Sequence, residues 1–230
     1  MTAPVLVAVA HGSRDPRSST TVRALVDLVR ERAPGTDVRP AFLDFDHPGL
    51  TDVLAGLGDR PAVVVPLLLG SAYHARVDIP AIVAATRPDV PVADVLGPDP
   101  ALLDVAAERL GELGLTPGDP GLGIVLAATG STHAAANEVV HRLAARWPGT
   151  LAGFATATPG IGHAVARLRA QGAERIAVAS WFLAPGRLLD RVHEQAGAPV
   201  AEALGAHPAI ADLVITRYRR ALTSHLLRAA

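Results

Sequence analysis

The 230-residue chain contains no cysteine, and this absence excludes disulfide bonds, a thiol nucleophile and cysteine-ligated zinc or iron–sulfur sites. It also contains no lysine, so all 21 of its basic residues are arginines, whose planar guanidinium groups suit the binding of carboxylates. Any metal must therefore be held by nitrogen and oxygen ligands. Nine histidines make such a site feasible.

An excess of charge of either sign is also absent, since the formal net charge is −1. This balance argues against nucleic acid or an anionic membrane surface as the main partner. The longest apolar stretch, residues 61–73, is too short to span a bilayer and contains Pro66. No basic segment precedes the apolar residues 5–10, so a cleaved signal peptide is not expected. With half of its residues hydrophobic, the chain is expected to be a soluble, cytoplasmic protein with a sizeable core.

Short apolar runs alternate with longer amphipathic segments through the first half of the chain. This alternation of strands and helices predicts an α/β module with four β/α units and a parallel sheet flanked by helices. Strands are expected at residues 5–10, 38–43, 62–69 and 92–95, and helices at 18–32, 50–57, 79–86 and from Asp99-Pro100 onward, an aspartate cap followed by a proline.

Residues 115–121 are rich in proline and glycine and are predicted to form a linker. The same alternation restarts after it, so two tandem modules are expected, at residues 1–114 and 122–230. In the second module strands are expected at 123–128, 150–155 and 176–183, and helices at 134–146, 162–171, 188–195 and 209–228.

Sequence landmarks recur in the same order in the two halves. Ala-His-Gly-Ser at 10–13 matches Ala-Thr-Gly-Ser at 128–131, and Pro-Gly-Thr at 34–36 matches Pro-Gly-Thr at 148–150. The spacing is nearly constant and shrinks slightly along the chain, as small deletions in loops would produce. The pattern indicates an internally duplicated α/β module.

Three polar residues follow the carboxyl ends of the first three predicted strands. His11 follows the first strand, Asp44 closes the second, and His74 lies in the loop after the third. The carboxyl ends of parallel strands share one edge of the sheet, where ligands bind, so these residues are expected to converge. Two imidazoles and a carboxylate suit a divalent first-row metal with open coordination positions. Taken singly, each residue also has a structural interpretation, as a hydrogen-bonding histidine or a helix-capping carboxylate.

The second half offers an internal comparison for these positions. Its fold landmarks repeat those of the first half, whereas the three polar residues do not recur. This difference predicts one active half and one structural half. The residues at the matching positions are Thr129, Thr156 and, within the error of the alignment, Leu188.

The loop at residues 11–16 joins the first strand to the predicted helix. Gly12 allows the backbone to approach a ligand closely, and free amides at a helix start favour an anionic group. Arg14, Arg17 and Arg76 flank this crevice and could bind carboxylates. The loop matches neither a P-loop nor a dinucleotide fingerprint. The alternatives are a tight turn for Gly12 and Ser13 and solvated surface charges for the arginines.

These segments resemble those of the sirohydrochlorin chelatases, the class II cobalt and iron chelatases, in their long two-module form. The resemblance rests on residues 6–16 (LVAVAHGSRDP), 41–44 (AFLD), 65–74 (VPLLLGSAYH) and 78–80 (DIP). The second half is similar to the degenerate partner module of the long members. The resemblance implies that His11 and His74 bind the metal, that these two and Asp44 are catalytic, and that the substrate is bound by Gly12, Ser13, Arg14, Ser71, Ala72, Tyr73 and Arg76.

The chain departs from the family pattern at one position. The family usually carries a glutamate where this chain has Asp44, whose shorter side chain places the carboxylate about one methylene farther back. Asp46 lies two residues farther along and is an alternative source of the carboxylate.

The resemblance implies insertion of a divalent metal into sirohydrochlorin, giving sirohaem with Fe²⁺ or cobalt-sirohydrochlorin with Co²⁺. The metal is then a substrate, and no organic cofactor is needed. The two ions make almost the same demand on imidazole and carboxylate ligands. The abundance of alanine, glycine and proline, with arginine as the sole basic residue type besides histidine, indicates a GC-rich coding sequence. Because sirohaem synthesis is the commoner need in organisms of that type, iron is favoured over cobalt. Two modules in one chain also predict a monomer that mimics a dimer of single modules.

Two other functions fit some of the same residues. A non-catalytic carrier of metal or tetrapyrrole with this fold would bind tightly and turn over nothing, but it would need further ligands to close its site. A phosphoesterase could use His11 as a nucleophile, but that chemistry requires an arginine directly before the histidine, where this chain has Ala10.

Overall fold

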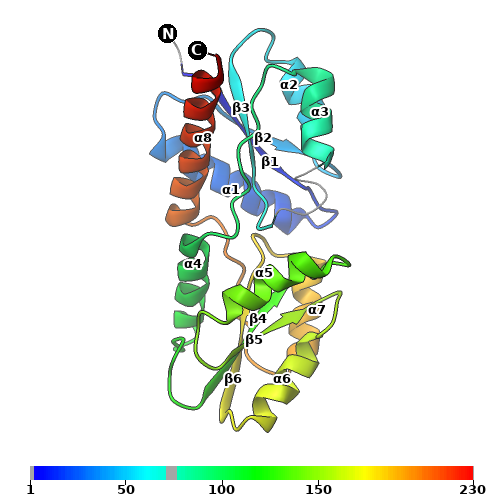
Figure 1. Ribbon diagram of the computed structural model, residues 1–230, viewed down its shortest axis with the longest axis vertical. Coiled ribbons are helices and arrows are strands. Elements are labelled where there is room, and N and C mark those ends of the chain that lie inside the picture. The colour runs from blue at the N-terminus through cyan, green and yellow to red at the C-terminus, as the bar shows by residue number, and fades with distance from the viewer. Residues whose placement is uncertain (1–2, 71–76, 230) are drawn as a thin grey trace. The chain divides into compact units, whose positions relative to one another are not determined.

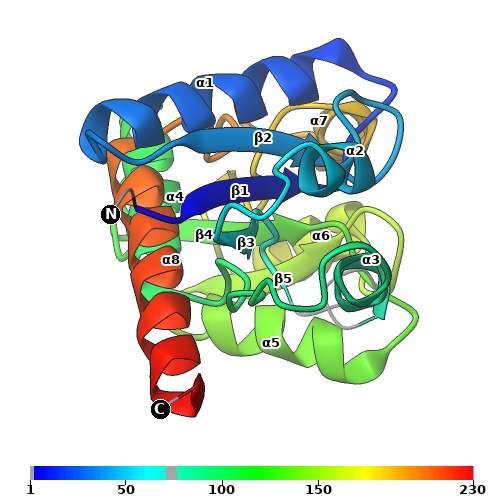
Figure 2. The same ribbon diagram turned by 90° about the horizontal axis from the view of Figure 1, so that it is seen from above.

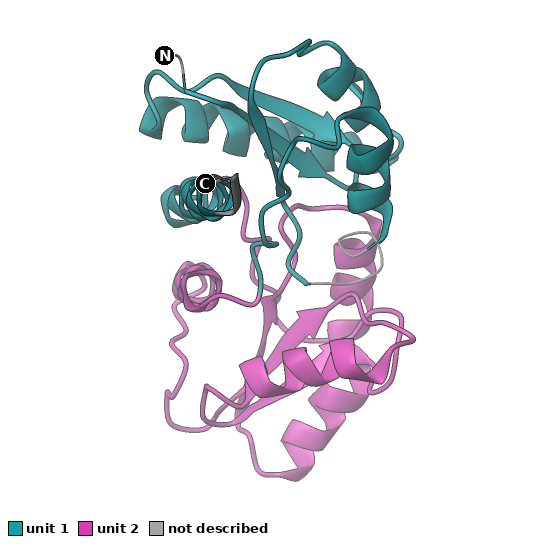
Figure 3. Ribbon diagram, turned by 45° about the horizontal axis from the view of Figure 1, so that its top comes forward, with its two compact units in different colours: residues 1–97, 206–230 teal, residues 98–205 magenta. Residues whose placement is uncertain are grey.

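The computed structural model describes residues 3–70 and 77–229 (Figure 1). These residues form two three-stranded parallel sheets, with strand orders β2–β1–β3 and β5–β4–β6. The chain divides into two compact units, residues 1–97 together with 206–230, and residues 98–205 (Figure 3). We call them unit 1 and unit 2.

Unit 1 is built on a sheet in which β1 (Val5–Ala10) lies between β2 (Val38–Phe42) and β3 (Ala62–Pro66). All six residues of β1 are buried, as expected for the central strand of a parallel sheet that is covered on both faces. Both neighbours pair with β1 in parallel, so the three carboxyl ends share one edge.

Two pairs of helices cover the faces of this sheet. On one face α2 (Leu50–Ala55) and α3 (Ile79–Thr86) pack against the odd-numbered residues of β1. On the other, α1 (Pro16–Arg32) and α8 (Pro208–Ala229) contact each other, and Figure 2 shows α1 running alongside β2. Within the described residues no helix is both long enough and apolar enough to cross a membrane.

Unit 2 repeats this architecture around β4 (Leu122–Ala128), which is flanked by β5 (Thr150–Phe154) and β6 (Arg175–Ser180). Every residue of β4 is buried. One core cluster joins this strand to two of the four helices, α6 and α7. The helices of the unit are α4 (Pro100–Gly111), α5 (Ala134–Ala144), α6 (Ile161–Ala170) and α7 (Arg187–Ala196).

The two units match down to individual backbone hydrogen bonds. The amide of Asp44 donates to the carbonyl of His11 at 2.9 Å, and at the same place in unit 2 the amide of Thr156 donates to the carbonyl of Thr129 at 2.9 Å. Gly12 and its counterpart Gly130 share a φ of +89°. The predicted α/β class and the duplicated module are therefore confirmed.

The strand predicted at residues 92–95 is wrong. Val92 forms only an isolated bridge with Val64, so each sheet has three strands. The amide of Val64 donates to the carbonyl of Pro91 at 3.0 Å, and the amide of Ala93 donates to the carbonyl of Val64 at 2.8 Å. No further backbone pairing with β3 follows in this segment. Proline cannot donate to a ladder, and Pro91 therefore limits the pairing to this single bridge.

Several predicted boundaries also differ from the structure, by one to three residues. Helix α1 begins at Pro16, two residues before the predicted start, because the Asp15 side chain caps it by accepting from the Arg17 amide at 3.0 Å. Strand β3 ends at Pro66, three residues earlier than expected.

The division into units differs from the predicted one, which placed a linker at 115–121. Those residues connect α4 to β4 inside unit 2, and the amide of Leu115 donates back to the last turn of α4. Helix α4 packs against β6, whereas α8 packs against α1 and β3 of unit 1. An amphipathic helix carries no signal for which of two similar sheets it will cover, so the sequence pattern assigned both helices to their sequence neighbours.

Candidate functional site

His11 directly follows the central strand of unit 1, at the edge that holds the carboxyl ends of all three strands. The backbone amide of Asp44 donates to its carbonyl at 2.9 Å, and the amide of Leu43 donates to Ala10 at 3.1 Å. Pairing between β1 and β2 thus continues for one residue past the strands. It places His11 and Asp44 next to each other, with the His11 side chain half-buried and Asp44 exposed.

Gly12 is the point at which the loops after β1 and β2 touch. Its φ is +89°, and a β carbon there would lie 1.8 Å from the backbone carbonyl oxygen of Asp44. Any side chain would collide with backbone rather than with a flexible group. A glycine is therefore required beside the two candidate catalytic residues.

The two carboxylates at the end of β2 have different surroundings. Oδ2 of Asp46 accepts a hydrogen bond from the backbone amide of Ser13 at 2.9 Å, which ties the loop after β1 to the loop after β2. Asp46 is half-buried, whereas the Asp44 side chain is exposed at the edge. The Asp46 carboxylate thus joins the two loops, whereas the Asp44 carboxylate is open to solvent.

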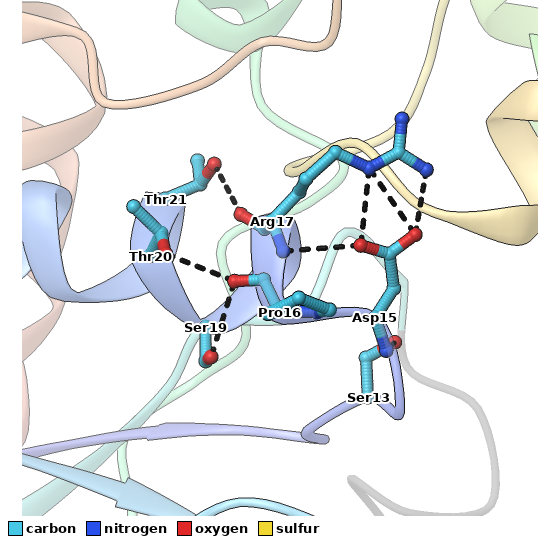
Figure 4. A network of polar contacts seen from close by, with 7 residues as sticks. All are labelled: Ser13, Asp15, Pro16, Arg17, Ser19, Thr20 and Thr21. Atoms are coloured by element: carbon cyan, nitrogen blue, oxygen red, sulfur yellow. Dashed lines mark hydrogen bonds and ion pairs between the residues drawn. The ribbon is translucent and has the colours of Figure 1, made fainter.

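The start of α1 is occupied by groups of its own loop (Figure 4). The Asp15 carboxylate accepts from the Arg17 amide at 3.0 Å and from its guanidinium, with an N–O distance of 2.6 Å. The amide of Ser18 donates to the Asp15 carbonyl at 3.1 Å. Because these amides already have acceptors, the expected anion site at the helix start is filled by Asp15 itself.

Phe45 is a candidate residue of this site that sequence reasoning missed. Phe45 is 55% exposed, and the centroid of its ring lies 6.4 Å from that of the His11 imidazole. The exposed Arg14, expected to bind substrate, has its guanidinium carbon 5.0 Å from the centre of the same ring. The available signal was an aromatic residue between two aspartates in the loop that closes β2.

The third predicted part of the site lies outside the described residues. The amide of Leu67 donates to Val9 at 2.7 Å, which brings the chain after β3 to the same edge as His11. Within residues 3–70 and 77–229, no group of three histidine or acidic side chains could hold a metal. The residues named earlier that fall outside are Ser71, Ala72, Tyr73, His74 and Arg76.

The corresponding edge of unit 2 carries neutral groups. The Thr156 hydroxyl donates to the carbonyl of Thr129 at 2.8 Å. The amide of Ser131 donates to the side-chain oxygen of Asn137 at 2.8 Å, where the matching Ser13 uses the Asp46 carboxylate. Unit 2 thus keeps the fold of this edge with threonine at the positions that match His11 and Asp44.

The model of the CbiX family matches residues 5–113 and again residues 123–221. The chain belongs to the CbiX family. Two successive matches in one chain confirm the predicted family of sirohydrochlorin chelatases in its two-module form.

Curated relatives agree with this placement. A sirohydrochlorin cobaltochelatase of Priestia megaterium is 25% identical over 242 residues, which cover 93% of this chain and 78% of the relative. A sirohydrochlorin cobaltochelatase of Methanosarcina acetivorans is 28% identical over 122 residues, 46% of this chain but 94% of the relative. A whole protein of that size thus corresponds to about half of this chain.

Among solved structures, SirB from Bacillus subtilis with Fe³⁺ superposes with a TM-score of 0.79 and covers 96% of both chains. The sequence identity is 20%, so this likeness concerns the fold. It confirms the predicted chelatase-like architecture over the full length.

Proposed function

We propose that this chain is a sirohydrochlorin chelatase that inserts Fe²⁺ or Co²⁺ into the macrocycle. The observation that carries the proposal is the placement of His11 beside Asp44 at the shared edge of the unit 1 sheet, in a chain whose two halves both match the CbiX family. The names of the curated relatives support the substrate, and the Fe³⁺ in SirB supports a metal of this class.

The reaction exchanges two pyrrole N–H protons for one divalent ion, so the net charge of the macrocycle does not change. Imidazole titrates near neutral pH and can therefore either hold a first-row metal or accept a proton. We assign both tasks to His11 and His74, which receive the ion and take up the departing protons. The exposed carboxylate of Asp44 partly balances the charge of the incoming ion.

The substrate carries several carboxylates, and arginine suits their recognition. We assign this binding to Arg14 and Arg76, together with Gly12, Ser13 and residues 71–73. Arg14 is exposed close to the site, whereas Arg17 is already paired with Asp15. Arg14 is therefore the member of the described set best placed to meet a substrate carboxylate.

The metal in this proposal is a substrate, and its site should stay open and bind only moderately tightly. No organic cofactor takes part. We further propose that the chain acts in the cytoplasm as a monomer. Light scattering coupled to size-exclusion chromatography would test the monomer, which predicts the mass of one 23.7 kDa chain.

The test is an anaerobic absorbance time course with sirohydrochlorin and either Fe²⁺ or Co²⁺, against a blank without enzyme. We expect many turnovers per chain with at least one ion, and the faster ion identifies the preferred metal. His11→Ala should lose this activity, whereas Thr129→Ala, the matched change in unit 2, should retain it.

Two results would overturn the proposal. One is full insertion activity in His11→Ala. The other is a stoichiometric spectral change without turnover in the wild type, which would make the chain a carrier. Circular dichroism of both variants would establish that they are folded, so that a loss of activity can be assigned to the site.

A further inference from the structure

Phe45 has a backbone conformation that bulky residues rarely adopt. Its φ is +61°, and it is the only non-glycine residue with positive φ among those the structure describes. The amide of Asp46 donates to the carbonyl of Asp44 at 2.6 Å, so a tight turn closes around Phe45. Such a turn is strained for an aromatic residue, and strain of this kind persists where the surroundings hold it and a function uses it.

The turn is present in unit 1 and missing from unit 2. In both units the second residue after the second strand donates from its amide to the residue that follows the first strand, and the last residue of the second strand donates to the carbonyl of a proline farther along. Three residues separate Asp44 from Pro48, whereas two separate Thr156 from Pro159. The half that keeps the candidate catalytic residues thus has one additional residue at this point.

Burial of the Phe45 side chain does not offset the strain of its backbone. Phe45 is 55% exposed, and it is the one aromatic residue among the exposed large hydrophobic residues of the described chain. Its neighbours are the His11 ring, tilted by 60° to it, and the Arg14 guanidinium. An apolar face thus stands in solvent between a candidate metal ligand and a cation suited to carboxylates.

We infer that Phe45 is a substrate-contacting, specificity-determining residue whose ring packs against the face of the tetrapyrrole macrocycle beside His11. This inference rests on the proposed function. A flat conjugated ring with carboxylates at its rim matches an aromatic face next to an arginine, because the face packs on the macrocycle while the guanidinium reaches the rim. The contact would hold the central nitrogens near His11.

The test uses the full chain and the variant Phe45→Gly, which removes the ring and also relieves the positive φ. We expect metal-free sirohydrochlorin to bind this variant about tenfold more weakly, by absorbance titration, since loss of an aromatic stacking partner commonly costs this much. The KM for sirohydrochlorin should rise by a similar factor while the KM for the metal stays unchanged. The midpoint of thermal unfolding should not fall.

Two further variants sharpen the result. Phe45→Tyr keeps an aromatic face and should bind nearly as well as the wild type. Leu113→Ala shortens an apolar residue of unit 2 that is 43% exposed, and it should change neither the affinity nor the KM for sirohydrochlorin.

The outcomes separate the inference from the proposed function. Wild-type affinity and KM in Phe45→Gly, with an active wild type, would overturn the inference alone. A KM for the metal that rises together with that for sirohydrochlorin would also overturn it, because Phe45 would then support the metal site. A wild type that neither binds nor metallates sirohydrochlorin would overturn both.

Discussion

The backbone amide of Ser13 donates a hydrogen bond to Oδ2 of Asp46 at 2.9 Å, across 33 positions of sequence. This bond joins the loop that carries His11 to the loop that carries Asp44. It therefore couples the two candidate catalytic residues mechanically, although neither takes part in the bond.

Replacing the two aspartates separately should give different results. Asp46→Ala leaves the half-buried Ser13 amide without its charged acceptor and should lower the free energy of unfolding by about 1–2 kcal/mol. Asp44→Ala removes an exposed side chain and should leave stability within about 0.5 kcal/mol while it lowers the rate of metal insertion. Urea unfolding and the insertion assay measure the two effects. Equal stability losses, or full activity in Asp44→Ala, would contradict this assignment.

Gly12→Ala should be strongly destabilising, by at least about 2 kcal/mol, because the new β carbon would meet the Asp44 carbonyl at 1.8 Å and φ is +89°. Gly35→Ala is the matched control, since its φ is +85° and its β carbon would meet nothing within 4 Å. That control should cost only about 1 kcal/mol, from the backbone conformation alone. Similar costs in both variants would show that the loop after β2 moves away easily.

Arg217 fastens α8 to the chain that precedes unit 2. Its buried guanidinium donates from Nε to the carbonyl of Val95 and from Nη2 to that of Leu96, each at 2.9 Å. Arg217→Met should lower the free energy of unfolding by about 2–4 kcal/mol, because both carbonyls lose a charged donor. Arg219→Met, an exposed position on the same helix, should change it by less than about 0.5 kcal/mol. Chemical denaturation of both variants measures the two changes in the free energy of unfolding.

Tyr218 makes the free energy of unfolding depend on pH in the alkaline range. Burial raises the pKa of its phenol above the ordinary value of 10.0, and its hydroxyl donates to the carbonyl of Pro4 at 2.6 Å. The folded state therefore keeps its proton more tightly than the unfolded state. The contribution is complete below pH 10 and is lost as the pH rises through the folded-state pKa.

Tyr218→Phe should accordingly cost about 1 kcal/mol at pH 8, where the hydrogen bond is intact. The gap between wild type and variant should narrow as the pH rises above 10. Urea unfolding across this range measures it. A gap that stays constant with pH would show that the phenol titrates alike in both states.

Much of the fold could be predicted because its signals are local. The strand at 5–10 is a continuous apolar run between Pro4 and His11, and the structure gives the same limits. The start of α1 could have been found as well, since Asp15-Pro16 carries the same cap that identified Asp99-Pro100 as a helix start. The assignment of α4 to unit 2 and of α8 to unit 1 could not be predicted in this way. Helical periodicity specifies which face of a helix is buried, but not which sheet covers that face.

The candidate site also has a part that could be predicted from the sequence and a part that could not. The neighbouring positions of His11 and Asp44 follow from the rule that parallel strands share a carboxyl edge, which needs only the order of the elements. The Phe45 turn and the bond between Ser13 and Asp46 depend on one additional residue and one positive φ. Such features arise from backbone detail that residue types do not encode.

Unit 1 consists of two segments that are separated in the sequence by unit 2, and this determines the order in which the units can fold during synthesis. Residues 98–205 are continuous and can fold as soon as they leave the ribosome, whereas unit 1 must wait for a helix that is translated after all of unit 2. Until then the faces of α1 and β3 that α8 covers stay open. A chain whose synthesis stops early thus lacks a finished first unit, and the unit that carries His11 is the last to be completed.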